Sequence, residues 1–187
     1  MASFIENMLI EHCSPTLAGI KIANLFSVSK EDRSIALEEL EYYRALLFEK
    51  GIEISVLGNC GLRFLVYVYR KNMVQKLLKR DDIRLFLKNC GYNLFDIKDV
   101  LSVIDHRICN DKCFPHEIGV LLGYPLKDVE GFIRQKGQGC ICSGCWKAYG
   151  DKCEAEKCFL SIDKCRCEYK RLYREGASIY DLTAYAV

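Results

Sequence analysis

Apolar positions recur every three or four residues through most of this chain, a spacing typical of helices that bury one face. The clearest case follows Ser29, which is placed to cap a helix whose apolar stripe ends before Gly51. The pattern therefore predicts a mostly helical protein. The segments expected to be helical are residues 4–11, 15–26, 30–50, 71–80, 82–90, 95–107 and 151–175, with a short helix after Ser178.

In one region the apolar side chains recur at every second residue instead. Residues 52–56 alternate between apolar and polar side chains, residues 58–61 read Gly-Asn-Cys-Gly, and residues 62–69 are again apolar and β-branched. This order predicts two antiparallel strands joined by a tight turn. Residues 146–149 are a candidate for a further short strand. We expect an α+β fold, mostly helical, with a small antiparallel hairpin.

The chain is expected to form a single domain over residues 1–187. Helices and the strand hairpin would occupy residues 1–107, and a cysteine-rich helical portion would occupy residues 108–187. A chain of this length can bury a sizeable apolar core. The length alone therefore gives no reason to divide the chain into two domains.

Residues 117–133 carry glycines at the small and turn positions of a helix-turn-helix motif. The second helix of that motif would present Asp128 and Glu130, and two acids near phosphates repel a nucleic-acid duplex. We interpret the segment as a plain helical hairpin and do not expect a nucleic-acid partner.

The amino-acid composition bears on whether the protein is ordered, what it associates with and where in the cell it is located. Half of the 187 residues are hydrophobic, which argues against disorder, and the net charge of +2 is too small to predict attraction to nucleic acid or membranes. The first residues lack the basic region of a signal peptide, and Arg63 interrupts the longest apolar stretch. We expect no membrane span and a cytoplasmic location.

The chain has 12 cysteines, and all but Cys13, Cys60 and Cys90 lie between residues 109 and 167. In a reducing compartment such a density indicates metal binding, redox chemistry or simple burial. Cys140, Cys142 and Cys145 form a C-x-C-x2-C cluster, and Cys153 is the nearest fourth ligand. Zinc, copper(I) or an iron–sulfur cluster suits such thiolates, and a reversible disulfide is the alternative.

A second group of candidate ligands precedes the helical hairpin. Cys109, Cys113 and His116 are spaced so that they can converge on one point, although three ligands are one short of a closed zinc site. The alternative is that both cysteines pack and His116 lies on the surface. The sequence leaves these two interpretations open.

A catalytic site is the other hypothesis for these residues. Cys13 lies beside His12 at an expected helix start, where a thiolate is favoured. His116 and Glu117 follow Pro115 at another helix start, where the imidazole stays neutral and suited to act as a base. An enzyme would use Cys13 as nucleophile, His116 or His12 as base, and Glu117 to orient the base.

Three segments together resemble a known family: HCSPTLAGIKIANLF at 12–26, FPHEIGVLLGYPLKDVEGFI at 114–133 and GCWKAYGD at 144–151. They are similar to an uncharacterised family of small proteins, mostly from anaerobic bacteria, and the resemblance covers nearly the whole chain. It implies a bacterial cytosolic setting but no activity. The family has tyrosine where this chain has Cys145, so a shared site is expected near Cys13 and His116. The resemblance draws attention to His12, Cys13, Pro15, His116, Glu117, Trp146 and Tyr149.

These observations favour a cysteine-rich cytosolic protein that binds a metal or undergoes thiol redox change, with zinc or an iron–sulfur cluster as the expected cofactor. Two alternatives remain: a Cys/His-dependent enzyme acting on a small molecule, and a non-catalytic binding module. A small molecule or a redox protein is the expected partner.

Overall fold

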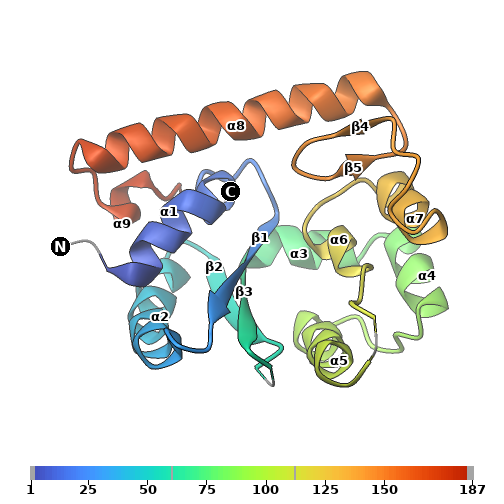
Figure 1. The fold of residues 1–187 in the computed structure, drawn as a ribbon, viewed down its shortest axis with the longest axis horizontal. Helices are drawn as coiled ribbons and strands as arrows, with labels where there is room; N and C mark the ends of the chain where they lie inside the picture. The colour runs from blue at the N-terminus through green and yellow to red at the C-terminus, as the bar shows by residue number, and fades with distance from the viewer. Residues whose placement is uncertain (1–2, 60, 112, 185–187) are drawn as a thin grey trace.

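The computed structural model describes residues 3–59, 61–111 and 113–184. Within them the predicted α+β class is confirmed: helices surround a three-stranded antiparallel sheet, and a two-stranded sheet lies near the start of the last long helix (Figure 1). The helices are α1 (Phe4–Leu17), α2 (Arg33–Phe48), α3 (Lys71–Leu78), α4 (Asp81–Asn89), α5 (Ile97–Asn110), α6 (Ile118–Leu121), α7 (Leu126–Arg134), α8 (Lys152–Arg174) and α9 (Ile179–Leu182). The strands are β1 (Ala23–Ser29), β2 (Ile52–Leu57), β3 (Arg63–Arg70), β4 (Cys142–Ser143) and β5 (Lys147–Ala148).

The larger sheet has the order β1-β3-β2, with β3 antiparallel to both neighbours. Val66 at its centre lies opposite Phe26 on β1 and Val56 on β2. The predicted hairpin is therefore confirmed as β2 and β3. Cys60, which we expected in its turn, lies outside the described residues.

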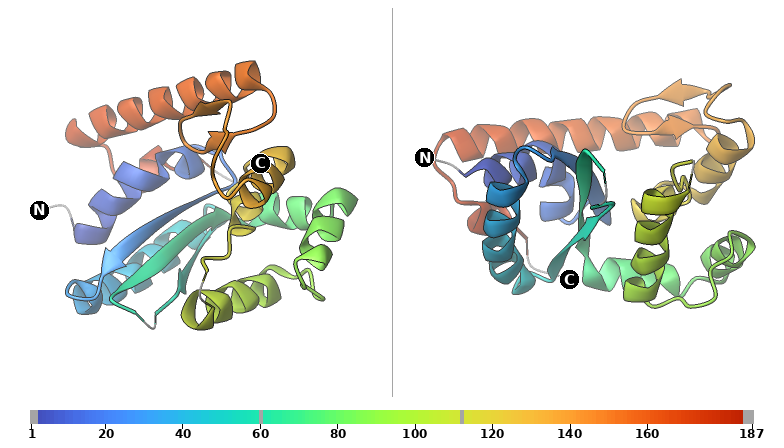
Figure 2. Two further views of the ribbon diagram at one scale, coloured as in Figure 1. Left: turned by 45° about the vertical axis from the view of Figure 1, so that its right-hand side comes forward. Right: turned by 60° about the horizontal axis from the view of Figure 1, so that its bottom comes forward.

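Side chains of β3 alternate between two apolar cores, because successive residues of a strand point to opposite faces. Phe64, Val66 and Val68 pack with α1 and α2, whereas Tyr67 and Tyr69 pack with α3 to α7. Figure 2 shows the sheet between these two helical layers. The hydroxyl of Tyr67 donates a hydrogen bond of 2.8 Å to the carbonyl of Leu121, which ties the sheet to α6.

The expected helix start at Pro15 is wrong, because α1 continues through it to Leu17. Pro15 has no backbone N–H, so the carbonyl of Glu11 loses its usual helical donor in the last turn of α1. Arg70 then binds the end of this helix: its guanidinium donates to the carbonyls of Thr16 at 2.7 Å and Leu17 at 2.6 Å. Gly19, at a φ of +80°, lets the chain turn away.

The prediction of helix for residues 15–26 is also wrong beyond α1, since residues 23–29 form the edge strand β1. Phe26 and Val28 pack on one face of the sheet, while Ala23 packs in the core on the other. Apolar residues on both faces hide the period of two that marks a half-buried strand. The short alternation of Phe26 and Val28 with serines was the available signal.

The long C-terminal helix is confirmed. Asp151 accepts a hydrogen bond from the backbone N–H of Glu154 at 3.0 Å and so caps α8. The further short strand is also present as β5, which pairs with β4 in a small hairpin. Figures 1 and 2 show α8 extending across the molecule from this hairpin, over α1, to α9.

The segment 117–133 forms the expected helical hairpin, although α6 is a single turn. Gly123, at a φ of +81°, and Pro125 make the corner between α6 and α7. Gly119 lets α7 approach closely, since a Cβ there would lie 3.1 Å from Val129 Cγ2. Among residues 3–59, 61–111 and 113–184, no helix combines the length and apolar character needed to cross a membrane.

Candidate functional site

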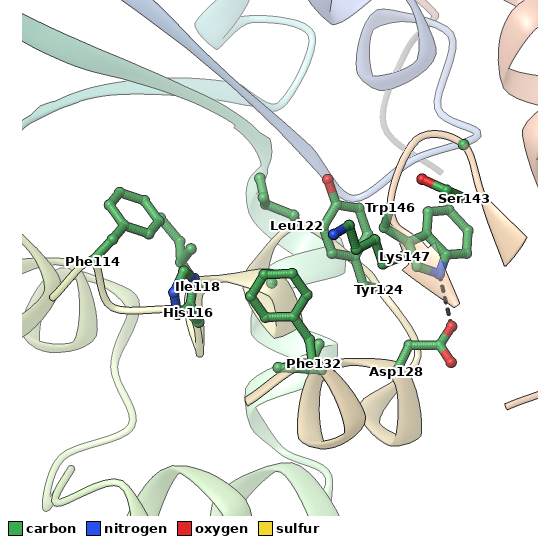
Figure 3. Close-up of a pocket in the computed structure, with 13 residues that line it drawn as sticks. Phe114, His116, Ile118, Leu122, Tyr124, Asp128, Phe132, Ser143, Trp146 and Lys147 are labelled. Atoms are coloured by element: carbon green, nitrogen blue, oxygen red, sulfur yellow. Dashed lines mark hydrogen bonds between the residues drawn. The ribbon is translucent and has the colours of Figure 1, made fainter. Parts of the chain in front are cut away.

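A cavity of about 390 Å³ lies between the helical hairpin and the β4–β5 hairpin. Most of its wall is aromatic or aliphatic, and we call it the aromatic pocket. Figure 3 shows Phe132 in the middle of it, with His116 and Phe114 on one side and Tyr124 and Trp146 on the other. Its lining residues are Phe114, His116, Ile118, Gly119, Leu122, Tyr124, Asp128, Val129, Phe132, Ser143, Gly144, Trp146 and Lys147.

Stacked rings form one wall of the pocket. Tyr124 and Trp146 stack with ring centroids 5.1 Å apart, and Trp146 meets Phe159 of α8 edge to face at 4.5 Å. Gly144 permits this packing, since a Cβ there would lie 2.4 Å from Phe159 Cδ2. The β4–β5 hairpin is thus held between α8 and the corner of the helical hairpin.

Asp128 fixes the indole ring of Trp146. Its carboxylate is 4 % exposed and accepts hydrogen bonds from Trp146 Nε1 at 2.7 Å and from the backbone N–H groups of Tyr149 at 2.7 Å and Gly150 at 2.8 Å. Asp128, which a helix-turn-helix would present to nucleic acid, is instead directed into the protein. Three donors compensate its burial, so the carboxylate is occupied within the protein.

The opposite wall combines an imidazole with two phenyl rings. His116 lies edge-on to Phe132, with centroids 4.8 Å apart, and 5.7 Å from the ring of Phe114. His116 follows Pro115 in the turn before α6, whose first helical residue is Ile118. The imidazole is therefore at the rim of an apolar cavity.

Lys147 and Ser143 supply hydrogen-bond donors to the pocket. The ammonium of Lys147 donates to the carbonyl of Gly137 at 2.7 Å and remains exposed. It retains two further N–H donors, because an ammonium has three. A molecule that offers acceptor atoms at its edge matches this side of the pocket.

Glu117, the predicted orienting group, points away from the aromatic pocket. Its buried carboxylate pairs with Arg107 of α5 and accepts a hydrogen bond of 3.0 Å from the hydroxyl of Tyr92. Arg107 also donates to the carbonyl of Cys90 at 2.6 Å. Glu117 thus joins α5 to the start of α6, and within the described residues it does not contact the imidazole of His116.

The structure does not bring Cys13 and His116 together. Cys13 is fully buried among α1, α2 and the sheet, while His116 lies at a pocket bounded by the other core. Burial raises the pKa of the Cys13 thiol, which favours its neutral form. His12 stacks on Phe26 at 5.6 Å, and burial lowers the pKa of its imidazole.

Cys140, Cys142 and Cys145 all lie in or beside the β4–β5 hairpin. Cys142 pairs across the hairpin with Ala148, and Cys145 occupies its turn. The sulfur of Cys145 lies 3.8 Å from Arg166 Nη1 of α8. Nearby acidic side chains and burial raise the pKa of Cys142, with burial the larger cause.

The other predicted ligands are dispersed. Cys153 is exposed on α8, Cys113 is exposed before α6, and Cys109 on α5 is disulfide-bonded. Among the residues described here, no group of three or more His, Cys, Asp or Glu side chains is arranged to hold a metal ion. The geometry accordingly provides no assembled ligand set at either predicted cluster.

Sequence reasoning missed several side chains of this region, namely Lys21, Tyr124, Phe132 and the buried Asp128. Lys21 is 8 % exposed, and its ammonium lies 5.1 Å from the ring centroid of Tyr124. A lysine between Ile20 and Ile22 was the available signal, since charges are seldom found in such a stretch.

Residues 9–183 match the model of a family described as a protein of unknown function, DUF3793, and the chain belongs to this family. No curated protein matches it. No solved structure matches it.

Proposed function

We propose that this family member is a binding module for a small planar molecule held in the aromatic pocket. The observation that carries the proposal is a cavity of about 390 Å³ walled by Tyr124, Trp146, Phe132 and His116. Concave, mostly apolar cavities with a few polar groups are the usual sites for small molecules.

Ring geometry supports a flat ligand. The walls present the faces and edges of aromatic rings, which favour stacked or edge-to-face partners over bulky aliphatic ones. Lys147 and Ser143 provide donors, whereas the carboxylate of Asp128 is already used by three N–H groups. The ligand expected is therefore a neutral or acidic heteroaromatic molecule with a carbonyl or similar acceptor at its edge.

The test uses the fluorescence of Trp146, the single tryptophan of the chain. Benzamide and cyclohexanecarboxamide form a matched pair that differs in the flatness of the ring. We expect benzamide to change the emission of Trp146 saturably, and at a concentration at least about tenfold lower than its saturated analogue, a preference of about 1.4 kcal/mol. Phe132→Ala should remove the response.

Leu160→Ala is the control for this experiment. Leu160 is an apolar residue on the exposed surface of α8 and does not line the pocket. Its replacement should leave the response to benzamide unchanged. Equal responses to the two amides, or a response that survives Phe132→Ala, would overturn the proposal.

A second candidate function is thiol chemistry at the β4–β5 hairpin. It is favoured by the position of Cys145, whose half-buried sulfur lies 3.8 Å from the guanidinium of Arg166. Reactive cysteines occur in partly exposed, electropositive surroundings of this kind. Cys153 and Cys167 are exposed in the same molecule and serve as internal controls.

Iodoacetamide labelling followed by peptide mapping separates these thiols. We expect Cys145 to be alkylated faster than Cys153 and Cys167, and Arg166→Gln to remove the difference. Metal content, measured on protein purified without oxygen, tests whether Cys140, Cys142 and Cys145 bind zinc or an iron–sulfur cluster with Cys153. A metal-free sample with unprotected thiols would end the metal hypothesis.

A further inference from the structure

Lys21 presents an unusual electrostatic situation. It follows the end of α1, and 8 % of its surface is exposed, yet no hydrogen bond or ion pair to its ammonium occurs among the described residues. Its closest aromatic contact is the ring of Tyr124, at 5.1 Å. A ring face compensates a buried cation only in part, since charges removed from water normally require an opposite charge.

The charged and titratable groups around Lys21 do not remove this imbalance. They are the thiols of Cys13 on α1 and Cys145 in the hairpin turn, and the guanidinium of Arg166 on α8. No carboxylate is among them. Burial, the largest effect, and the Arg166 guanidinium lower the pKa of the Lys21 ammonium to about 8, against the opposing effect of the Cys145 and Cys13 thiols. Lys21 is therefore mostly protonated at neutral pH.

Arg166 is also incompletely satisfied. Its Nε is buried and has no hydrogen-bond acceptor among the described residues. The other side of its guanidinium reaches the sulfur of Cys145 and, at 3.5 Å, the carboxylate of Asp163. Two cations thus lie near one another, with the exposed carboxylates of Asp163 and Glu11 on the side of Arg166.

A cavity of about 160 Å³ adjoins Lys21, and Arg166 is not among its lining residues. It shares Trp146 with the aromatic pocket and none of that pocket's other lining residues. Ser161 of α8 adds a hydroxyl donor to the cavity, next to Lys21 and Cys158. The cavity is lined mainly by apolar residues, with Lys21 and Ser161 as its cationic and hydroxyl side chains, and it has space for a molecule of the size of phosphate.

We propose that the cavity beside Lys21 is a binding site for a small oxyanion, with Lys21 as its principal charge and Ser161 as a hydrogen-bond donor. A bound oxyanion supplies the negative charge that this part of the protein lacks. The proposal is independent of the planar ligand of the aromatic pocket, because the two cavities share only Trp146.

The experiment measures thermal unfolding and Trp146 fluorescence of the full chain at pH 7. Sodium phosphate, sulfate and acetate are compared with sodium chloride at matched ionic strength, which separates binding from screening. At about twenty times the dissociation constant, a bound anion should raise Tm by roughly 4–7 °C in a chain of this size.

Two lysine variants make the measurement specific. Lys21→Met should remove the rise in Tm, and Lys157→Met, which removes the same charge from an exposed position outside the cavity, should retain it. Phosphate and sulfate acting without acetate would assign a tetrahedral dianion, and acetate acting alone would assign a carboxylate. Chloride acting as well as the oxyanions, or an equal rise in Lys21→Met, would overturn the proposal.

The dependence on pH provides a second readout. Phosphate is almost entirely dianionic above pH 8, whereas Lys21 loses its proton as the pH rises through about 8. Affinity for phosphate should therefore fall at least about tenfold between pH 7 and pH 9.5. An affinity that stays constant over this range would contradict a role for the ammonium of Lys21.

Discussion

Two buried charges lie near the two ends of helix α6, and only one of them has a counter-charge within the described part of the protein. Glu117 meets Arg107 and the hydroxyl of Tyr92, and Arg107 in turn binds the carbonyl of Cys90. Lys21, at the end of α1, has a ring face and no carboxylate. A paired charge holds elements together, whereas an unpaired one lowers the stability of the free protein and favours whatever anion compensates it.

Asp128 extends this comparison. Like Glu117 it is a buried carboxylate whose acceptors are filled, here by the indole of Trp146 and two backbone N–H groups. Asp128 therefore maintains the shape of the aromatic pocket, whereas Glu117 ties α5 to the start of α6. The groups left over for ligands are Lys147 and His116 in that pocket and Lys21 in the neighbouring cavity.

The largest loss of unfolding free energy should come from breaking the ion pair of Arg107 with Glu117. Arg107→Met leaves the carboxylate of Glu117 buried without its cation, which typically costs about 3–5 kcal/mol of unfolding free energy. Urea denaturation measures the loss. A loss below about 1 kcal/mol would show that water reaches Glu117 and that the pair contributes little.

Asp128→Ala should cause the next largest loss of unfolding free energy. It leaves the indole N–H of Trp146 and two backbone N–H groups without an acceptor, at a cost of roughly 2–4 kcal/mol. Because the indole is no longer fixed, the emission of Trp146 should shift and benzamide binding should weaken. Unchanged emission with lowered stability would separate the two roles of this acid.

Lys21→Met should act in the opposite direction and stabilise the protein. The variant retains most of the unbranched side chain and removes a charge whose pKa falls from 10.5 to about 8 on folding. The gain expected in anion-free buffer at pH 7 is roughly 3 kcal/mol. A destabilised variant would indicate that the ammonium is compensated within the protein.

The stabilisation by Lys21→Met should decrease as the pH rises. Below pH 8 Lys21 is protonated in both states, and the folded protein bears the full cost of the buried charge. Between about 8 and 10.5 the folded state loses the proton first, so the cost shrinks, and above 10.5 it disappears. The free-energy difference between variant and wild type, measured at pH 6.5 and 9.5, should therefore fall.

The smallest change in stability is expected when an exposed ion pair is removed. Arg171 bonds Glu168 and Glu175 on the surface of α8, where water and salt screen the interaction. Arg171→Met should leave the denaturation midpoint unchanged within error. It is the matched control for Arg107→Met, since both variants remove one arginine from an ion pair and differ in burial.

Local patterns predicted most of the fold. The strand pair β2–β3, the cap at Asp151 and the final helix after Ser178 all depend on residues close in sequence. The error at Pro15 has a local cause as well, because proline is favoured at the first position of a helix and the local sequence does not show that α1 carries this one in its last turn. Strand β1 was missed because both of its faces are covered.

The candidate site was predictable only in part. The resemblance singled out His116 and Trp146, and both line the aromatic pocket. The partners of buried polar groups were not predictable, because Arg107–Glu117 and Asp128–Trp146 are tertiary contacts. The pairing of Cys13 with His116 stays a prediction that the geometry does not support, since no local pattern reveals which elements meet across about a hundred residues.

Helix α8 limits how far the protein can be shortened. At about 1.5 Å per residue, its 23 residues extend for roughly 34 Å. Its first half supplies Phe159 behind Trp146, and its second half binds α1 through the ion pair of Lys170 with Glu11. A fragment ending at Gly150 would keep every lining residue of the aromatic pocket and lose the support of its tryptophan. A fragment that keeps the aromatic pocket in its present geometry therefore extends well beyond Lys147, the last residue that lines it.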